Sequence, residues 1–212
     1  DEVQLMGAGL ATTTQLAAFR ESFGTLADCQ TMWMSATLVP EWFQSVDLKK
    51  ICPSPPVMRL SVEDMGFAEL KTRLIATKHI VKCSKNISDM KGLARSVLDA
   101  HQHKTLTLVV MNTVDRATQM FQHLRSLTHV SSSQKAINTA LADFPETVLL
   151  HSRFRPADRA RNLEILLNSG KWPEAGLIVV STQVIEAGIN ISAKTLFTEL
   201  APLSSMIQRF GR

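Results

Sequence analysis

Residues 179–212 read VVSTQVIEAGINISAKTLFTELAPLSSMIQRFGR, and this stretch decides how the rest of the chain is interpreted. It continues an apolar run that begins at Leu177, and such a run is typical of a strand buried on both faces of a parallel sheet. The run ends in the small polar residues Ser181, Thr182 and Gln183. Because open α/β sheets bind ligands beyond the carboxyl ends of their strands, these residues indicate a functional site there.

Outward from this stretch, predicted strands and helices alternate. Short apolar runs predict strands at 105–111, 147–150, 177–181 and 195–199, and helical spacing predicts helices at 114–127, 156–168 and 203–210. This alternation predicts an α/β fold with a doubly wound parallel sheet. Nearer the amino terminus, a helix at 12–23 and a buried strand at 31–34 predict only the back half of a similar unit.

A proline-rich segment, CPSPP at 52–56, is the best candidate for a domain boundary, because proline interrupts both helices and strand pairing. The segment that follows is expected to contain helices at 64–75 and 88–102 and a basic, strand-like run at 78–83. We therefore expect three parts: the carboxyl-terminal portion of a first lobe at 1–56, a helical linker and entry to the second lobe at 57–104, and a second lobe, truncated at its C-terminus, at 105–212.

Spacing also predicts where single side chains lie. On the first helix, the core side chains are expected to be Leu16, Phe19 and Phe23. A short helix that starts at Pro40 is expected to turn inward Trp42, Phe43 and Val46. Near the end of the 88–102 helix, His101 and His103 are expected to lie in solvent or to cap the helix dipole, and no metal site is expected there.

The composition of the chain limits the classes of protein to which it can belong. The chain has 212 residues, of which 45% are hydrophobic, and no apolar run reaches the roughly 18 residues of a membrane helix. No signal peptide is visible, and three widely spaced cysteines favour free thiols, so we expect a cytoplasmic protein. A net charge of +4 permits a nucleic-acid partner without demonstrating one.

Short motifs occur in the order that superfamily-two helicases show. They are D-E-V-Q at 1–4, S-A-T at 35–37, N-T at 112–113, H-S-R-F at 151–154, T-Q-x-x-E-x-G at 182–188 and Q-R-x-G-R at 208–212. In the longer strings NTVDRA, LLHSRFRPADRAR and STQVIEAGINIS, the chain resembles the CRISPR-associated helicase–nuclease of type I interference systems. The resemblance covers nearly the whole chain and is weakest over residues 57–104.

The resemblance implies two RecA-like lobes, the first of them incomplete, in an ATP-dependent translocase or helicase that acts on single-stranded DNA. It implies ATP and Mg²⁺ as cofactors. The implied partners are single-stranded DNA and an RNA-guided surveillance complex, with the protein acting as a monomer and without a membrane. Contacts to DNA would be mainly to phosphate, so binding should tolerate any sequence and weaken with salt.

The same resemblance implies roles for particular residues. Phosphoryl transfer needs a bound Mg²⁺ and an oriented water, for which the matching positions are Asp1 and Glu2 respectively. Positions near the nucleotide would be Gly188, Asn190, Gln208 and Arg212, with Arg212 as an arginine finger and Arg209 as an anchor of its motif. The residues that line the DNA track would be Asn112, Thr113, Arg153 and Thr182, and those that couple the two sites would be Ser35 and Thr37.

Departures from the family pattern bear on activity. Position 190 is Asn where the family has Asp, so a neutral amide replaces a carboxylate. The chain contains no G-x-x-x-x-G-K-[ST] phosphate loop and nothing that matches the family's histidine–aspartate nuclease domain. We therefore interpret the sequence as a fragment that is inactive alone and attribute the function to the parent protein. Two alternatives stay open: another superfamily-two helicase acting on RNA or DNA, and a non-hydrolysing remnant that only binds.

Overall fold

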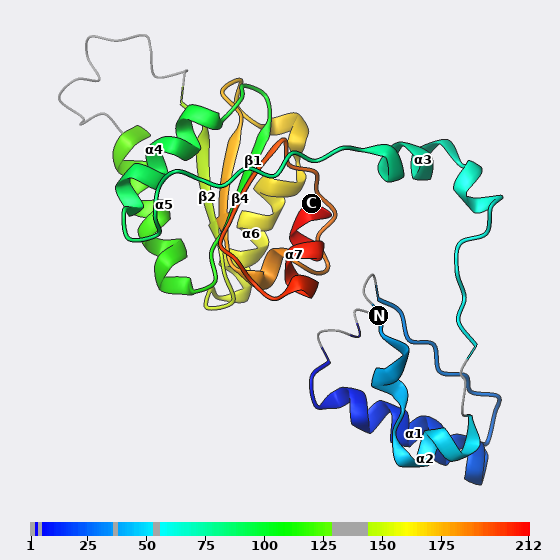
Figure 1. The fold of residues 1–212 in the computed structure, drawn as a ribbon. Coiled ribbons are helices and arrows are strands. Elements are labelled where there is room, and N and C mark those ends of the chain that lie inside the picture. The colour runs from blue at the N-terminus through cyan, green and yellow to red at the C-terminus, as the bar shows by residue number, and fades with distance from the viewer. Residues whose placement is uncertain (1–2, 4–5, 36–37, 53–55, 129–143) are drawn as a thin grey trace, which may run out of the picture. The chain divides into compact units, whose positions relative to one another are not determined.

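The structure is a computed structural model that describes residues 3, 6–35, 38–52, 56–128 and 144–212. Contacts divide the chain into two compact units, Asp1–Lys82 and Cys83–Arg212 (Figure 1). The division falls inside the segment 57–104 that the sequence marks as a linker. Each unit is described by itself below.

The second unit is built on a sheet of four parallel strands in the order β2-β3-β1-β4. In the register, Val110 lies beside Ser181 on one side and beside Thr198 on the other, while Leu150 also lies beside Ser181. The strands therefore end level with one another. The predicted α/β fold with a parallel sheet is confirmed by β1 (Leu106–Val110), β2 (Glu146–Leu150), β3 (Leu177–Ser181) and β4 (Thr195–Thr198).

Helices cover both faces of this sheet. Figure 1 shows α4 and α5 on one side and α6 and α7 on the opposite side. Their bounds agree closely with the prediction: α4 (Met90–Ala100), α5 (Val114–Thr128), α6 (Pro156–Leu167) and α7 (Leu203–Phe210), with short 3-10 turns at Ser169–Lys171 and Gln183–Ile185. All five residues of β1 and of β3 are buried, which explains their continuous apolar sequences.

Alternate side chains of the central strands enter two separate cores. Val109 and Ile178 join the core under α4 and α5, whereas Leu108 and Val179 join the core on the α6 face. This follows from the two-residue period of a strand, which turns successive side chains to opposite faces. Because α4 contributes to the first of these cores, it packs as part of the second unit and covers one face of the sheet.

The prediction for His101 is wrong. Its ring is half-buried, and Nε2 donates to the carbonyl oxygen of Ala175 at 2.7 Å while Nδ1 accepts from the hydroxyl of Thr107 at 2.7 Å. Gly176 fits against the ring because it has no side chain: a Cβ there would lie 2.8 Å from His101 Nε2. Burial lowers the pKa of His101 from its usual 6.5, although the Ala175 bond acts against this shift.

In the first unit, the regular secondary structure of the described residues is all helical. It contains α1 (Gly9–Phe23), α2 (Val46–Ile51), α3 (Ala68–Ile75) and 3-10 turns at Pro40–Phe43 and Asp64–Gly66. The predicted strands at 31–34 and 78–83 are wrong, because neither segment is paired as a strand. A strand needs a ladder of backbone bonds to a neighbour, and among the described residues the segment 31–34 makes one such bond, from Val3 N to Met34 O at 3.2 Å.

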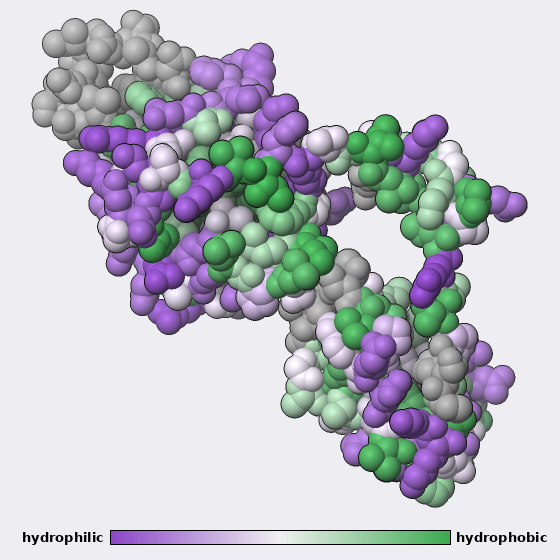
Figure 2. All heavy atoms as spheres, viewed as in Figure 1, coloured by the Kyte–Doolittle hydropathy of each residue, from purple (hydrophilic) through white to green (hydrophobic). Residues whose placement is uncertain are grey.

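The predicted core face of α1 is also wrong. Leu16, Phe19 and Phe23 are 47%, 49% and 84% exposed, and Figure 2 shows hydrophobic side chains on the surface of this unit. The small residues Ala17 and Ala18 are buried instead, because they allow close packing against Phe43 and Leu48. Of the three inward residues predicted after Pro40, only Phe43 is buried, since Trp42 is 39% and Val46 is 73% exposed.

No helix in the described part of the chain is long and apolar enough to cross a membrane.

Candidate functional site

The carboxyl edge of the sheet gathers most of the residues that the sequence singles out. Asn112 and Thr113 follow β1, Arg153 lies three residues beyond the end of β2, and Thr182 follows β3 directly. The backbone continues to pair beyond the strands, because Thr182 N donates to Leu150 O at 3.2 Å. Since the strands are parallel and end level, these loops lie at one edge of the sheet.

Arg209 of α7 is the centre of a buried hydrogen-bond network at this edge. Its side chain is fully buried, and its Nε donates to Glu186 Oε1 at 2.7 Å. Nη1 donates to Thr198 Oγ1 at 2.8 Å and to Glu199 O at 3.0 Å, while Nη2 donates to Asn112 Oδ1 at 3.0 Å. One guanidinium therefore joins the segments after β1, β3 and β4 to α7. The predicted role of Arg209 as an anchor is confirmed.

Asn112 is held on both ends of its amide. Its oxygen accepts from Arg209, and its Nδ2 donates to the carbonyl oxygen of Leu200 at 2.8 Å. Thr113 is exposed, and its hydroxyl accepts from the N–H of Arg116 at 3.3 Å in the first turn of α5. The hydrogen bonds of Asn112 thus hold the β1–α5 loop in place, while the side chain of Thr113 in the same loop is exposed to solvent. Direct contact of either side chain with nucleic acid stays a prediction.

The loop after the Gln183–Ile185 turn carries Gly188 and Asn190, two of the residues predicted to lie near the nucleotide. Gly188 has a φ of 72°, a backbone conformation that favours glycine, and both Gly188 and Asn190 are exposed. Arg212 donates from Nη1 to the carbonyl oxygen of Ile189 and from Nη2 to that of Glu186. Its Nε is buried and has no hydrogen-bond partner. Arg212 therefore lies against the loop that carries Gly188, and α7 also carries Gln208.

The turn after β2 presents Arg153 to solvent. The Arg153 side chain is 70% exposed, and Nη1 lies 3.6 Å from Oδ1 of Asp115, which is 81% exposed. Screening by solvent makes such a pair weak, so the guanidinium can exchange it for another anion. In contrast, Thr182 is only 5% exposed at the end of β3. Its place on the predicted DNA track stays a prediction.

The remaining predicted residues lie in the first unit. Asp1, Glu2 and Thr37 are outside the described residues, and Ser35 is partly buried. The structure therefore does not test the expected Mg²⁺ ligand, the expected water-orienting residue or the coupling pair. Within the described ranges, no group of three or more His, Cys, Asp or Glu side chains could hold a metal ion.

Sequence reasoning missed the partners of Arg209. The motif pattern marks Glu186 but does not indicate that it is the buried counter-ion, and it does not mark Thr198 or Glu199. Glu199 additionally pairs with Arg116 at 2.9 Å. The sequence does contain a signal for the ion pair. Glu186 and Arg209 lie in two consecutive motifs with apolar neighbours, and a buried charge needs a partner of opposite sign.

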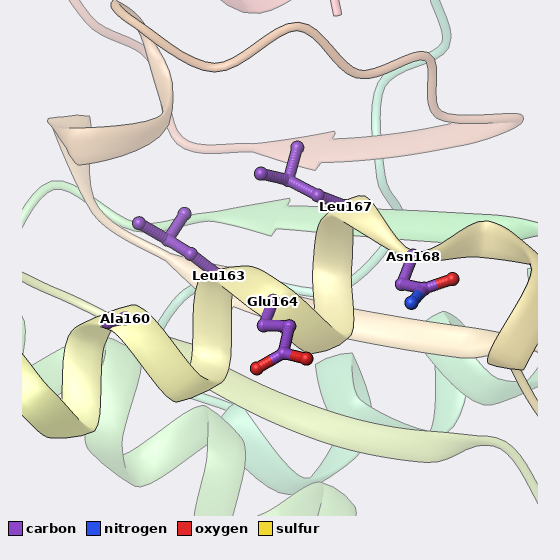
Figure 3. Close-up of a pocket in the computed structure, with 5 residues that line it drawn as sticks. All are labelled: Ala160, Leu163, Glu164, Leu167 and Asn168. Carbon is purple, nitrogen blue, oxygen red and sulfur yellow. The ribbon is translucent and has the colours of Figure 1, made fainter.

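A surface hollow beside α6 lies away from these residues. Figure 3 shows the five residues that line it, with Leu163 and Leu167 pointing to the same side of the helix. None of the residues predicted to bind nucleotide or nucleic acid lines the hollow formed by Ala160, Leu163, Glu164, Leu167 and Asn168. The carboxyl edge therefore remains the candidate site.

The motifs at the carboxyl edge of this parallel α/β sheet resemble those of superfamily-two helicases. The family described as CRISPR-associated nuclease/helicase Cas3, C-terminal, matches residues 103–212, which is more than half of the chain. The chain belongs to this family, as the resemblance in its longer sequence strings predicted.

Relatives with the same description agree. A CRISPR-associated nuclease/helicase Cas3 of Methanothermobacter thermautotrophicus is 26% identical over 176 residues, which cover 74% of this chain and 19% of that protein. A CRISPR-associated helicase Cas3 of Thermoproteus tenax is 32% identical over 107 residues, which cover 50% of this chain and 16% of the relative. The chain thus spans about a fifth or less of these relatives.

Among solved structures, the crystal structure described as T. fusca Cas3-ATP is similar with a TM-score of 0.48 and 23% identity. The similarity covers 63% of this chain and 14% of that one.

Proposed function

We propose that this chain is part of the motor core of an ATP-dependent, single-stranded DNA translocase or helicase that acts in CRISPR type I target degradation. The observation that carries the proposal is the Arg209 network, which ties the β1 loop, the loop after β3, the end of β4 and α7 into one edge. These segments carry the helicase-type motifs. Residues that would face nucleotide and residues that would face DNA are therefore held by one buried group.

ATP is the proposed nucleotide, bound by Gly188, Asn190, Gln208 and Arg212. An open space supports this assignment, because a Cβ built on Gly188 would meet nothing within 4 Å. When bound, ATP with Mg²⁺ supplies the phosphoryl group, which passes to water. Arg212 would stabilise negative charge as an arginine finger, since its guanidinium lies against the loop that carries Gly188. Asp1 and Glu2 would hold Mg²⁺ and orient the water.

Single-stranded DNA is the proposed polymer, contacted along the carboxyl edge by Asn112, Thr113, Arg153 and Thr182. Support comes from Arg153 and Thr113, which are exposed at this edge. Contacts of this kind are made to phosphate, so affinity should not depend on sequence and should fall steeply with salt. RNA carries the same phosphates, and a test with both polymers is therefore needed.

The proposed domain organisation places residues 1–56 in a first lobe and residues 105–212 in a second, with 57–104 between them. Because α4 packs on the sheet of the second unit, this helix of the middle segment covers one face of the second lobe. Ser35 and Thr37 would couple nucleotide and DNA binding. In a cell, the protein would act as a cytoplasmic monomer recruited by an RNA-guided surveillance complex.

One specific observation favours a second candidate function. Asn190 stands where the family has an aspartate, and its neutral amide cannot carry the charge of a carboxylate. A remnant that binds nucleic acid or a partner without turning over ATP is therefore the alternative.

The deciding experiment is ATP hydrolysis by the complete gene product, measured without nucleic acid, with single-stranded DNA and with RNA. We expect stimulation by DNA, and a loss of about 10³-fold or more in kcat for Arg212→Ala, as for other arginine fingers. Arg161→Ala removes an exposed arginine from α6 and is the matched control, expected to retain activity. Absence of turnover with either polymer would establish the non-hydrolysing alternative, and stimulation by RNA alone would reassign the polymer.

A further inference from the structure

A tight turn at residues 151–154 joins β2 to α6, and one side chain braces it from within. The N–H of Phe154 donates to His151 O at 3.4 Å, which closes the turn. The imidazole Nδ1 of His151 accepts the backbone N–H of Arg153 at 3.2 Å. The same ring stacks on Phe154, with centroids 4.2 Å apart and planes 10° apart. His151 therefore holds both of the residues that complete the turn.

The brace requires a particular form of the imidazole. Nδ1 can accept the Arg153 N–H only when it carries no hydrogen, so the ring is neutral and its hydrogen sits on Nε2. His151 is 9% exposed, and burial, followed by the charge of Arg153, lowers its pKa from the usual 6.5. Phe154 extends the brace inward, since it packs against the core under α4 and α5.

The brace acts on the residue that faces solvent. The backbone of Arg153 is fixed by His151, whereas its side chain is 70% exposed and meets Asp115 of α5 at 3.6 Å. Arg155, the next basic residue, has a closer partner, because its Nε lies 2.8 Å from Oδ2 of Asp158. A guanidinium on a fixed backbone loses less freedom when it binds than one on a loose loop, and this strengthens binding without a new contact.

We propose that His151 is a positioning residue that holds the backbone of Arg153 so that its guanidinium contacts a phosphate of single-stranded DNA. The inference rests on the proposed function, because it takes Arg153 as a phosphate contact. His151 itself touches no DNA in this arrangement. It acts through its hydrogen bond to the Arg153 N–H, and the stack on Phe154 keeps the ring in place.

Two substitutions separate the hydrogen bond from the stack. In His151→Asn, the side-chain oxygen takes the place of Nδ1 and can accept the N–H two residues on, as in an Asx turn, but the ring is lost. In His151→Phe, a ring remains for Phe154 but the acceptor is lost. The measurement is the Kd of the complete gene product for fluorescently labelled oligo(dT) at several salt concentrations, with folding checked by circular dichroism.

We expect His151→Asn to bind like the wild type. His151→Phe should weaken binding about as much as Arg153→Ala and lower the salt slope by up to about 0.7, the value for one phosphate contact on a single strand. The double variant H151F/R153A should bind like R153A alone, because residues that act through one contact are not additive. The control R155A removes a paired arginine and should have a smaller effect than R153A.

The reverse pattern, with His151→Phe like the wild type and His151→Asn weakened, would overturn the inference and leave a packing role. Additive losses in the double variant would overturn it as well. If Arg153→Ala itself changes neither affinity nor salt slope, the proposed phosphate contact at Arg153 fails, and this outcome is distinct from a failure of His151 alone.

Discussion

At the scale of single residues, Arg209 carries a charge that the sheet edge has removed from water. Glu186, which is 3% exposed on its side chain, balances that charge, and the remaining donors reach Thr198, Glu199 and Asn112. A buried ion pair contributes little net stability compared with an apolar pair, but removal of one partner leaves an unpaired buried charge. The network is therefore sensitive to the loss of either member.

We predict that Arg209→Met lowers the free energy of unfolding by about 3–5 kcal/mol, because Glu186 is left buried and charged. Urea unfolding of the chain, followed by circular dichroism, measures this loss. The double variant E186Q/R209M should recover part of it, since both charges are then removed. The comparison is a pair that is buried less deeply: the Arg116 side chain is 46% and the Glu199 side chain 11% exposed, so Arg116→Ala should cost less than Arg209→Met. Equal losses for Arg209 and Arg116 would contradict the prediction.

His101 predicts a dependence of stability on pH. Its pKa is lowered in the folded chain by burial, so the folded state resists a proton that the unfolded state accepts near pH 6.5. The contribution is complete above about pH 6.5 and is lost as the pH falls from there toward the folded pKa. Unfolding free energies from pH 8 to pH 5 should therefore decline less for His101→Gln than for the wild type. A parallel decline would show that His101 does not contribute.

At the scale of elements, the sequence predicts the second unit well and the first unit poorly. Strands β1 and β3 are recognisable because burial on both faces requires an unbroken apolar run. The segment 31–34 is equally apolar, but a strand also needs a paired neighbour, which its own sequence does not encode. Helical spacing similarly identifies an apolar stripe on α1. It does not indicate that the small residues Ala17 and Ala18, rather than this stripe, pack against Phe43 and Leu48.

In the candidate site, too, the sequence predicts some features and not others. The family resemblance implies that Arg212 and Gly188 lie near the same nucleotide, and Arg212 bonds the loop that carries Gly188. The bond between Arg209 and Asn112 joins positions 97 residues apart and depends on strand order, which no local pattern reports. The half-buried position of His101 likewise depends on Gly176, a neighbour supplied by a distant turn.

The two sides of α1 should respond differently to substitution. Ala18 is 1% exposed in the core with Phe43, so Ala18→Leu should overpack it and lower the free energy of unfolding by about 1–3 kcal/mol. Phe23 is 84% exposed, so Phe23→Ser should change stability by less than about 0.5 kcal/mol and should raise solubility. Thermal unfolding and sedimentation after heating measure both effects. A larger loss for Phe23→Ser would mean that this face is covered in solution.

At the scale of the whole molecule, the chain consists of two compact units joined near Lys82. Residues 76–82 are exposed and belong to no helix or strand. We predict that brief trypsin treatment cuts at Lys78 or Lys82 and leaves a fragment that starts near Cys83, because proteases need exposed backbone outside regular structure. Mass spectrometry identifies the cut, and the fragment should still unfold cooperatively. First cleavage within α5 or α6 would contradict the division.

Because Arg209 lies near the end of this sequence, its partners Glu186 and Asn112 are synthesised before it. The ribosome makes β1, β3 and β4 before α7, so Glu186 and Asn112 emerge well before the guanidinium that satisfies them. Until α7 emerges, the sheet edge holds a carboxylate without its counter-ion, and the Arg209 network is incomplete. A stop codon between Thr198 and Arg209 would therefore leave a product that the cell's proteases recognise as unfinished, although every strand of the sheet is present.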